Sequence, residues 1–393
     1  MTPEGQLRGA VRAFLGGQSF EPHCHAWMTG FDPEFSRALG AQGWIGMTWP
    51  AAYGGGARPE RDRLVVIEEL LAAGAPVAAH WIADRQTGPA LLRYGQPEQC
   101  RRYLPLITRG ECFFAIGMSE PDSGSDLASI RTAATATADG WRVTGRKVWT
   151  GHAHQADYLL ALVRTAPRDS GQRHAGLSQL IIDLSAPGVT VRPIRSLDGG
   201  YHFNEVTLDD VPVGRNALLG REGSGWQQVT SELAYERSGP ERFLSTAPLL
   251  RELARRRVGR GDRQIGELIA ELQTLRTLSA MIADALEGGA DRGRASQDGA
   301  ALPGVADHEA AQPTVARAAP AREAAMVKDL GTRFELKVVD AARELLDTEP
   351  AADSPDALSR LLAEAILHGP EGTLRGGTTE ILRGIVARQL VTP

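Results

Sequence analysis

The sequence predicts a mainly α-helical protein with a central β domain, and three successive patterns along its 393 residues support this prediction. Apolar residues recur at helical spacing up to about residue 112, and short β-branched runs separated by Gly, Asp and Pro follow. Helical spacing returns near residue 222. We therefore expect an N-terminal helical domain over 1–112, a middle β domain over 113–221 and a C-terminal helical bundle over 222–393.

The N-terminal domain is expected to contain at least two amphipathic helices. The stretches RDRLVVIEELLAAG (61–74) and PEQCRRYLPLITRG (97–110) carry Leu and Ile at helical spacing, and the second ends on a glycine. The turn-rich loop WPAAYGGG (49–56) precedes them. In the middle domain, several short strands at regular spacing predict a small β-barrel or a sandwich.

The C-terminal bundle is expected to contain long helices over 227–257 and 263–289 and another over 322–346. Residues 290–321 are rich in Ala, Gly, Pro and Asp, so we expect an exposed, mobile insertion there. Pro240 has no N–H and would leave the carbonyl of Glu236 without its helical partner. A kink or a freed carbonyl is therefore expected in the first of these helices.

Composition excludes several classes of protein. The net charge of −5 argues against a general nucleic-acid binder or a protein of anionic membranes, and no apolar run reaches membrane-spanning length. The N-terminus lacks a signal-peptide pattern, and three scattered cysteines suggest a reducing compartment, so we expect a cytoplasmic protein; a processed organellar protein is the alternative. The stretch HCH (23–25) lacks companion ligands at usable spacing, so no metal site is expected.

Three polar stretches could carry chemistry. GMSEPDSGSD (117–126) follows a strand and offers hydroxyls and free N–H groups, and GRKVWTG (145–151) offers Trp149 as a flat surface for a ring system. Taken alone, both are better explained as a Ser/Asx turn and a half-buried strand Trp. LRGGTTEILR (374–383) places bare backbone N–H groups and hydroxyls at a helix start, where a phosphate or cofactor could bind.

Together with WPAAYGG, FNEVTLDDVPV (203–213) and GREGSGW (220–226), and in this order, these stretches resemble the acyl-CoA dehydrogenase family. The resemblance covers nearly the whole chain except 290–321, and GMSEPDSGSD is a highly specific signature. It implies a helical domain, a central β-barrel and a C-terminal four-helix bundle, assembled as a homotetramer or homodimer. FAD would bind non-covalently between barrel and bundle, partly through a neighbouring subunit.

The resemblance also implies a reaction, the α,β-desaturation of an acyl-CoA thioester. A carboxylate removes the α-proton, a hydride leaves the β-carbon for flavin N5, and an electron-transfer flavoprotein or similar acceptor takes the electrons. By position, the resemblance assigns cofactor contacts to Met118, Ser119, Ser125, Trp149, Thr150, Gly151, Gly377, Thr378 and Glu380. Substrate contacts fall to Ser125, Arg237 and Gly376.

The chain departs from the family pattern at three places. Gly151 stands where a Thr or Ser hydroxyl usually reaches flavin N5, so Thr150 or a backbone N–H would have to substitute. The Arg-x-x-Phe-Gly segment that reaches the FAD of another subunit is not evident, and Arg263 and Gln273 are weaker candidates. Gly376 stands where the family usually has its catalytic glutamate.

The base must therefore be sought elsewhere. Proton abstraction next to a thioester needs a carboxylate in a desolvated pocket and donors to the thioester carbonyl, and Gly376 can supply only an N–H. Some family members carry the base on the first long helix of the bundle, directly before an Arg. Glu236, followed by Arg237, matches that position without a gap. Without the resemblance, Glu236 would be an exposed helix acid paired with a nearby Arg.

Three functions are compatible with these observations. The first is an active acyl-CoA dehydrogenase with Glu236 as the base. The second is a non-catalytic or half-site subunit of a hetero-oligomeric enzyme, which the three departures fit. The third is a flavin monooxygenase or oxidase relative, whose reduced flavin reacts with oxygen. The acyl group cannot be read from the sequence.

Overall fold

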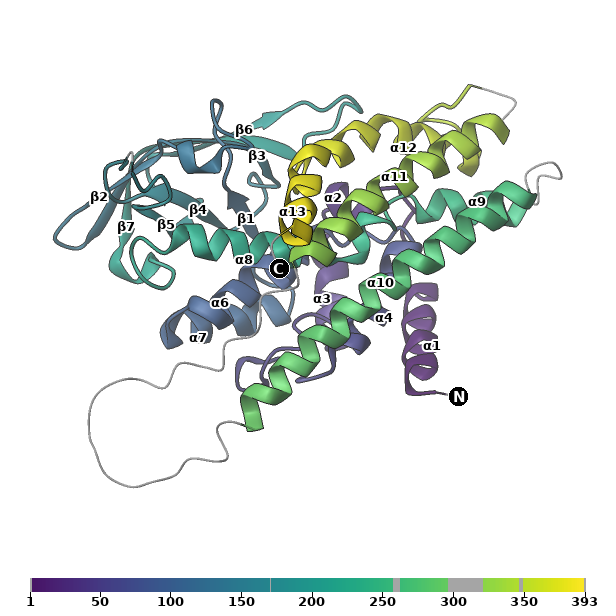
Figure 1. The fold of residues 1–393 in the computed structure, drawn as a ribbon, viewed down its shortest axis with the longest axis horizontal. Helices are drawn as coiled ribbons and strands as arrows, with labels where there is room; N and C mark the ends of the chain where they lie inside the picture. Colours follow the sequence, from purple (N-terminus) through teal and green to yellow (C-terminus); the bar gives the residue numbers. More distant parts are fainter. Residues whose placement is uncertain (1, 170, 257–261, 296–320, 346–348, 392–393) are drawn as a thin grey trace.

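The computed structural model describes residues 2–391 apart from 170, 257–261, 296–320 and 346–348. Its elements form three successive groups, helices, then a sheet, then helices again, and Figure 1 shows the sheet at one end of an otherwise helical molecule. The expected mainly helical architecture with a central β domain is confirmed. The helices of the first group are α1 Pro3–Gly16, α2 Ala26–Thr29, α3 Pro33–Ala41, α4 Glu60–Ala72, α5 Ala78–Ile82, α6 Gly88–Tyr94 and α7 Pro97–Thr108.

A π-helical turn, Ala83–Thr87, joins α5 to α6. It buries two charged residues, Asp84 and Arg85, and the Asp84 carboxylate accepts the N–H of Gly46 at 2.7 Å. π-Turns of this kind are frequent at functional sites. The turn therefore ties α5 and α6 to the segment that leads into the loop at 49–56.

The second group is one seven-stranded sheet with the strand order β1-β4-β2-β3-β7-β6, and β5 pairs with β4. The sheet curls into a half-barrel, the form that the expected barrel takes here. Its interior is filled by buried Val, Leu, Ile and Ala side chains from successive strands. The strands are β1 Phe114–Gly117, β2 Ala133–Ala136, β3 Gly140–Gly151, β4 Tyr158–Arg164, β5 Leu177–Asp183, β6 Val189–Ile194 and β7 Phe203–Gly214.

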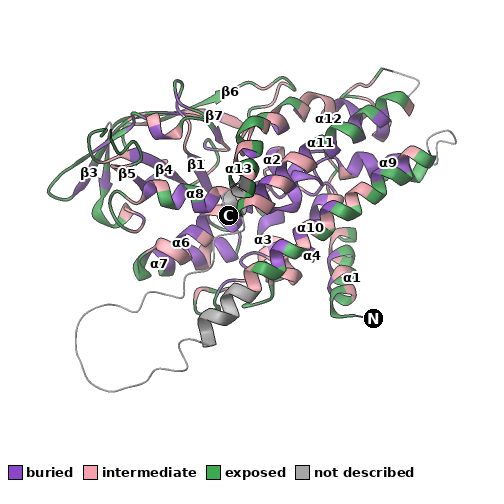
Figure 2. Cartoon of the chain, in the orientation of Figure 1, coloured by how far each residue is buried: buried purple, intermediate pink, exposed green. Residues whose placement is uncertain are grey.

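The third group begins with α8, which packs against β5 and so connects the sheet to the bundle. Helix α11 packs against α8, α10, α12 and α13, and buried faces line these contacts in Figure 2. Helix α9 packs against α4 and α12, which joins the bundle to the N-terminal helices. The bounds are α8 Gly225–Ser238, α9 Ala247–Arg256, α10 Asp262–Ala295, α11 Ala321–Leu345, α12 Ala357–Leu374 and α13 Thr379–Val391.

Two expectations for the bundle need correction. The predicted helix over 227–257 is two helices, because α8 stops before Pro240 and a short 3-10 turn, Pro240–Arg242, precedes α9. Helix α10 also continues to Ala295, past the expected start of the insertion at 290. Residues 296–320, most of that predicted insertion, lie outside the described residues.

Within the described parts of the chain, no helix combines the length and apolar character that crossing a membrane requires.

Candidate active site

The loop after β1 is fixed by a buried ion pair. Lys147 Nζ lies 2.9 Å from Glu120 Oε1 and donates to the Met118 carbonyl at 3.1 Å. Glu120 also accepts the backbone N–H groups of Arg131 and Thr132 at 2.7 and 2.9 Å. Burial lowers the pKa of Lys147 to about 8. Burial alone would raise the pKa of Glu120, but Lys147 and the N–H donors hold it below its usual value.

Trp149 lies beside this loop in a strained conformation. The N–H of Val148 donates to the Ser119 carbonyl at 2.9 Å, and the pairing of β3 with β7 then slips by one residue. Trp149 adopts φ +59°, which is rare for a bulky side chain and is a feature of functional sites. The side chain is 58% exposed and meets Phe203 edge-on at 5.9 Å. The strand thus presents an open aromatic surface.

The two residues after Trp149 differ in exposure. The Thr150 side chain is fully buried, and its Oγ1 has no hydrogen-bond partner among the described residues. Asn204 Nδ2 donates to the Thr150 carbonyl at 3.0 Å and fixes the backbone there. A Cβ added at Gly151 would enter open space. The volume that a Thr or Ser side chain would occupy at position 151 is therefore open.

Across from the sheet, the Glu236 carboxylate faces the turn between α12 and α13. A Cβ added at Gly376 would lie 3.0 Å from Glu236 Oε2 and 3.1 Å from Oε1. Gly376 has φ +68°, a conformation that favours glycine. Oε1 pairs with the Arg242 guanidinium, whereas Oε2 is buried and has no hydrogen-bond partner in the described chain. The carboxylate therefore lies beside the position from which the family's usual base would project.

The backbone at Glu236 confirms the expected freed carbonyl. Because Pro240 has no N–H, the helix cannot use the Glu236 carbonyl, and Arg242 Nε donates to it at 3.0 Å. Arg242 is only 2% exposed and lies over the Trp27 ring at 5.3 Å. One buried arginine thus binds both the Glu236 carbonyl and one oxygen of its carboxylate.

The neighbouring Arg237 holds the same turn from the other side. Arg237 Nε donates to the Gly376 carbonyl at 2.6 Å, and a Cβ at Gly377, which has φ +107°, would lie 3.2 Å from the Arg237 guanidinium. After this turn the Thr378 hydroxyl lies 3.5 Å from the N–H of Ile381 at the start of α13. Glu380 is exposed on the first turn of the helix.

Ser125 lies on the surface, near a wide hollow at the other end of the loop. The hollow has a volume of about 770 Å³ and is lined by residues 171–175, 221–224, 226 and 227. His174 and Trp226 stack at 4.0 Å in its wall, and Arg173 pairs with Asp126, the residue after Ser125. Aromatic and basic side chains therefore surround a space large enough for a sizeable ligand.

The structure does not bring every expected site residue together. Arg263 and Gln273 are exposed on α10, where Arg263 pairs with Glu267 and Gln273 accepts from Arg276. Contacts across subunits, which the sequence assigned to these two residues, are outside the reach of a single chain. Their cofactor role stays a prediction.

Glu232 is a site residue that sequence reasoning missed. It is 5% exposed, accepts from Gln179 at 3.1 Å and leaves Oε1 without a partner in the described residues. Burial raises the pKa of Glu232 to about 7 despite the Gln179 hydrogen bond, and the charge of Glu236 adds to the rise. The sequence could have indicated Glu232, because it lies four residues before Glu236 on α8 and residues four apart share a helix face.

Comparison with known proteins gives the family directly. Residues 3–111 match the N-terminal domain and residues 115–211 the middle domain of acyl-CoA dehydrogenases. The chain is 32% identical to acyl-CoA dehydrogenase IpdE1 of Mycobacterium tuberculosis, over 91% of this chain and 86% of that protein. It is 31% identical to acyl-CoA dehydrogenase FadE26 of the same organism, over 88% and 84% of the two chains.

Solved structures show the same similarity. A protein described as Tcur3481-Tcur3483 steroid ACAD superposes with a TM-score of 0.81 at 26% identity, over 100% of this chain and 99% of that one. The ChsE4-ChsE5 complex from Mycobacterium tuberculosis gives a TM-score of 0.74 at 28% identity, over 100% and 98%. With its helical, β and helical parts in the family order and the relatives above, this chain belongs to the acyl-CoA dehydrogenase family.

Proposed function

We propose that this chain is an FAD-dependent acyl-CoA dehydrogenase in which Glu236 is the base that removes the α-proton. The observation that carries this proposal is the position of the Glu236 carboxylate. It lies against Gly376, where the family's usual glutamate is absent, and a Cβ there would be 3.0 Å from Oε2. A base supplied from α8 thus reaches the place that a base from the α12–α13 turn would reach.

The residues around this position fit FAD. Trp149 offers an exposed ring on a strained backbone, and Gly151 leaves open space beside it. Gly377 keeps backbone accessible at the start of α13, where Thr378 and the helix N-terminus suit phosphate groups. We assign Met118, Ser119, Trp149, Thr150 and Gly151 to the flavin, and Gly377, Thr378 and Glu380 to the rest of the cofactor. Held by these residues, FAD would supply the acceptor for the β-hydride.

The protein's own part of the reaction is positioning and proton abstraction. Arg242 pairs with Oε1 of Glu236 and fixes the carboxylate, which leaves Oε2 free to take the α-proton. Charge develops on the thioester oxygen as that proton leaves, and the N–H of Gly376 is the backbone donor we assign to it. Arg237 holds the turn that presents this N–H by bonding the Gly376 carbonyl.

The CoA part of the substrate is assigned to the hollow beside Ser125. Its wall contains the His174–Trp226 stack, which suits a base ring, and Arg173 and Arg221, which suit phosphates. Ser125 is exposed and directly precedes Asp126, which pairs with Arg173 in the wall of this hollow. The acyl end would then extend toward Glu236.

The test is turnover of purified protein with a panel of acyl-CoA thioesters, steroid side-chain thioesters included, and an artificial electron acceptor. Glu236→Gln should lower kcat by roughly 10²–10⁴-fold, the range for loss of a general base, while the flavin absorbance stays unchanged. Glu98→Gln, an exposed acid on α7, serves as the control. Normal turnover by Glu236→Gln rejects the assignment.

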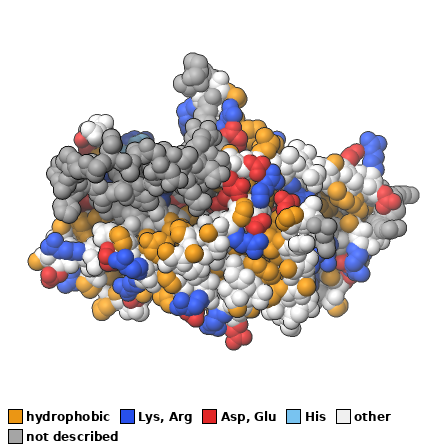
Figure 3. All heavy atoms as spheres, turned by 90° about the horizontal axis from the view of Figure 1, so that it is seen from below, with side chains coloured by type: hydrophobic (Ala, Val, Ile, Leu, Met, Phe, Trp, Pro, Cys, Tyr) orange, Lys and Arg blue, Asp and Glu red, His pale blue; other side chains and the backbone are white. Residues whose placement is uncertain are grey.

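We further propose that the enzyme works as an oligomer and passes its electrons to an electron-transfer flavoprotein or a similar acceptor. Apolar side chains reach the surface between charged ones on the face drawn in Figure 3. Ile269 and Met281 of α10 are 50% and 61% exposed, and Leu390 of α13 is 69% exposed. Helices α10 and α13 both pack against α11, and apolar residues exposed on the surface of a bundle can form subunit contacts.

A half-site role in a hetero-oligomer is the second candidate. Two of the structural relatives, Tcur3481-Tcur3483 and ChsE4-ChsE5, are named as pairs of proteins. Purifying the chain alone decides between the two. A yellow homo-oligomer with turnover supports the first proposal, and colourless protein that takes up FAD only with a second family member supports the other.

A further inference from the structure

Five of the nine histidines of the chain gather where the sheet meets the helices. His25 precedes α2, His152 and His154 follow β3, His202 precedes β7, and His368 lies on α12. Their rings form a chain of contacts, with centroids 5.5 Å apart for His25 and His368 and 5.8 Å apart for His202 and His368. None of these histidines has a part in the chemistry proposed above.

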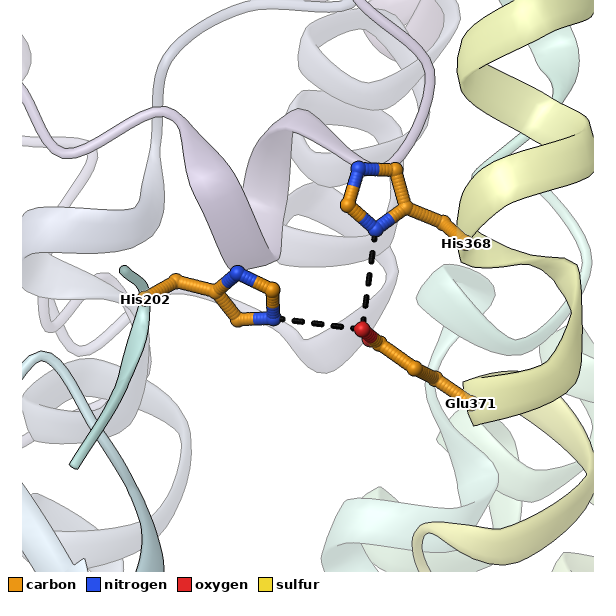
Figure 4. Close-up of side chains that lie close together, drawn as sticks. All are labelled: His202, His368 and Glu371. Carbon is orange, nitrogen blue, oxygen red and sulfur yellow. Dashed lines mark ion pairs between the residues drawn. The ribbon is translucent and has the colours of Figure 1, made fainter. Parts of the chain in front are cut away.

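Three side chains of this group converge on one point. Figure 4 shows His202 of the β6–β7 loop and His368 and Glu371 of α12 pointing toward one another. His202 Nε2 lies 3.4 Å and His368 Nδ1 3.7 Å from the same Glu371 oxygen, Oε1. One ligand atom from each of the three residues falls within 4.8 Å of the other two. Tetrahedral zinc with bonds of 2.0–2.1 Å separates its ligand atoms by about 3.4 Å.

The histidine nitrogens that face inward contact the Glu371 carboxylate but make no hydrogen bond in the described structure, although both histidines are buried. His202 and His368 are each 5% exposed, and His202 Nε2, His368 Nδ1 and Glu371 Oε2 have no hydrogen bond within the described structure. Behind them, His25 is 2% exposed, and both of its ring nitrogens are unpartnered in the same sense. Buried polar atoms without partners are costly and point to a missing ligand.

The outward-facing ring nitrogens are engaged instead. His368 Nε2 lies 3.3 Å from the Asp198 carboxylate, and His202 Nδ1 lies 3.5 Å from the Ser196 hydroxyl. An outer partner of this kind fixes the tautomer of a metal-binding histidine and leaves the inner nitrogen as the ligand.

We infer that His202, His368 and Glu371 form a binding site for a divalent transition metal of the zinc class. Two imidazoles and one carboxylate are a known zinc ligand set that leaves a fourth position open. Asp198 supports His368 from outside the site. The ion would join the β6–β7 loop to α12, the helix that leads into the Gly376 turn.

The experiment uses purified, full-length protein freed of metal with a chelator, with its flavin content recorded. Zn²⁺ is titrated by calorimetry, and bound metal is measured by elemental analysis. One Zn²⁺ per chain is expected, together with a rise in Tm, since an ion that binds only the folded state stabilises it. The readout does not depend on turnover, so the metal site and the proposed activity fail separately.

Variants assign the site. His202→Asn and Glu371→Gln each remove a ligand and should weaken Zn²⁺ binding by more than the roughly 10–100-fold that loss of an outer partner costs. Asp198→Asn removes an outer partner, so its Zn²⁺ affinity should fall by roughly 10–100-fold. Because Asp198 lies in a loop, this variant still tests the site if a ligand variant does not fold. His23→Asn is the matched control, because His23 pairs with Glu364 at 2.8 Å outside the cluster.

The inference is overturned if the protein takes up no Zn²⁺, or if His202→Asn and Asp198→Asn bind Zn²⁺ as tightly as His23→Asn does. Circular dichroism and flavin content show whether each variant is folded.

Discussion

The two halves of the candidate active site are built differently. The sheet half, with Ser119, Trp149 and Thr150, lies within residues 117–151 and is held by the Val148–Ser119 backbone hydrogen bond, the buried Lys147–Glu120 pair and the Asn204 side chain from β7. The helical half joins Glu236 to Gly376 across 140 positions of sequence, and side-chain contacts hold it. The sheet half therefore acts as a fixed support. In the helical half, the catalytic base can stand at either of two sequence positions, 236 or 376, without a change of fold.

The sheet half should lose the most when its buried pair is broken. Lys147→Met leaves the Glu120 carboxylate buried without its charge partner, which is expected to lower the free energy of unfolding by about 3–5 kcal/mol. Flavin should be lost with it, because the loop at 117–126 and the strand under Trp149 share this pair. Chemical denaturation and flavin absorbance measure both effects.

The control lies one residue away. Arg146→Met removes an exposed pair with Glu205, whose atoms are 3.3 Å apart, and surface pairs contribute at most about 1 kcal/mol. Equal losses from Lys147→Met and Arg146→Met would contradict the view that a buried pair organises the sheet half.

In the helical half, Glu232 should make stability fall as pH rises. Its pKa is about 7 in the folded protein, against 4.5 for an ordinary glutamate, so its favourable contribution is complete below pH 4.5 and is lost as pH rises through 7. This difference in pKa corresponds to about 3 kcal/mol. Glu232→Gln should remove this loss, so its stability advantage over the native protein should grow between pH 4.5 and 7. If the difference in unfolding free energy between Glu232→Gln and the native protein stays constant from pH 4.5 to 7, the assignment of this pH dependence to Glu232 is wrong.

Gly376→Ala tests the contact between Glu236 and the turn, with a smaller effect on stability. A side chain at φ +68° costs about 1–2 kcal/mol, and its Cβ would press on the Glu236 carboxylate at 3.0 Å. Displacing a catalytic group by about 1 Å can lower the rate roughly 10²-fold. Turnover and denaturation of the same protein separate the two effects.

Gly384→Ala is its matched control, since a Cβ at this α13 position meets only the Arg388 side chain, at 3.8 Å. Alanine in a helix interior should leave stability unchanged or raise it by about 0.5–1 kcal/mol. If both glycine variants keep full activity, the carboxylate does not depend on the space at position 376.

The order of helices, strands and helices was predictable because periodicity and turn residues are local. The break at Pro240 was only partly predictable. The missing N–H of Pro240 can be read from the sequence, and it predicts the freed carbonyl of Glu236. The donor that binds this carbonyl, Arg242, could not be predicted, because its position depends on how the chain turns after α8. The end of α10 was misplaced because helix propensity continues into the Ala-rich stretch.

The candidate site residues also differ in whether local sequence could predict them. Trp149 lies in a recognisable signature, and Glu236 was found through the absence of a glutamate at position 376. The metal cluster was not predictable, because two of its ligands, His202 and His368, lie 166 positions apart in the sequence. The HCH stretch, where no metal site was expected, contributes only His25, which lies next to His368. His25 has φ +58° and directly precedes α2.

The central claim, that Glu236 removes the α-proton, is tested most directly by hydrogen exchange at the α-carbon. An accepted acyl-CoA is incubated in D₂O without an electron acceptor, and deuterium at the α-carbon is measured by mass spectrometry. The native enzyme and Glu232→Gln should exchange this hydrogen, and Glu236→Gln with full flavin content should not. Continued exchange by Glu236→Gln would contradict the account and require another base.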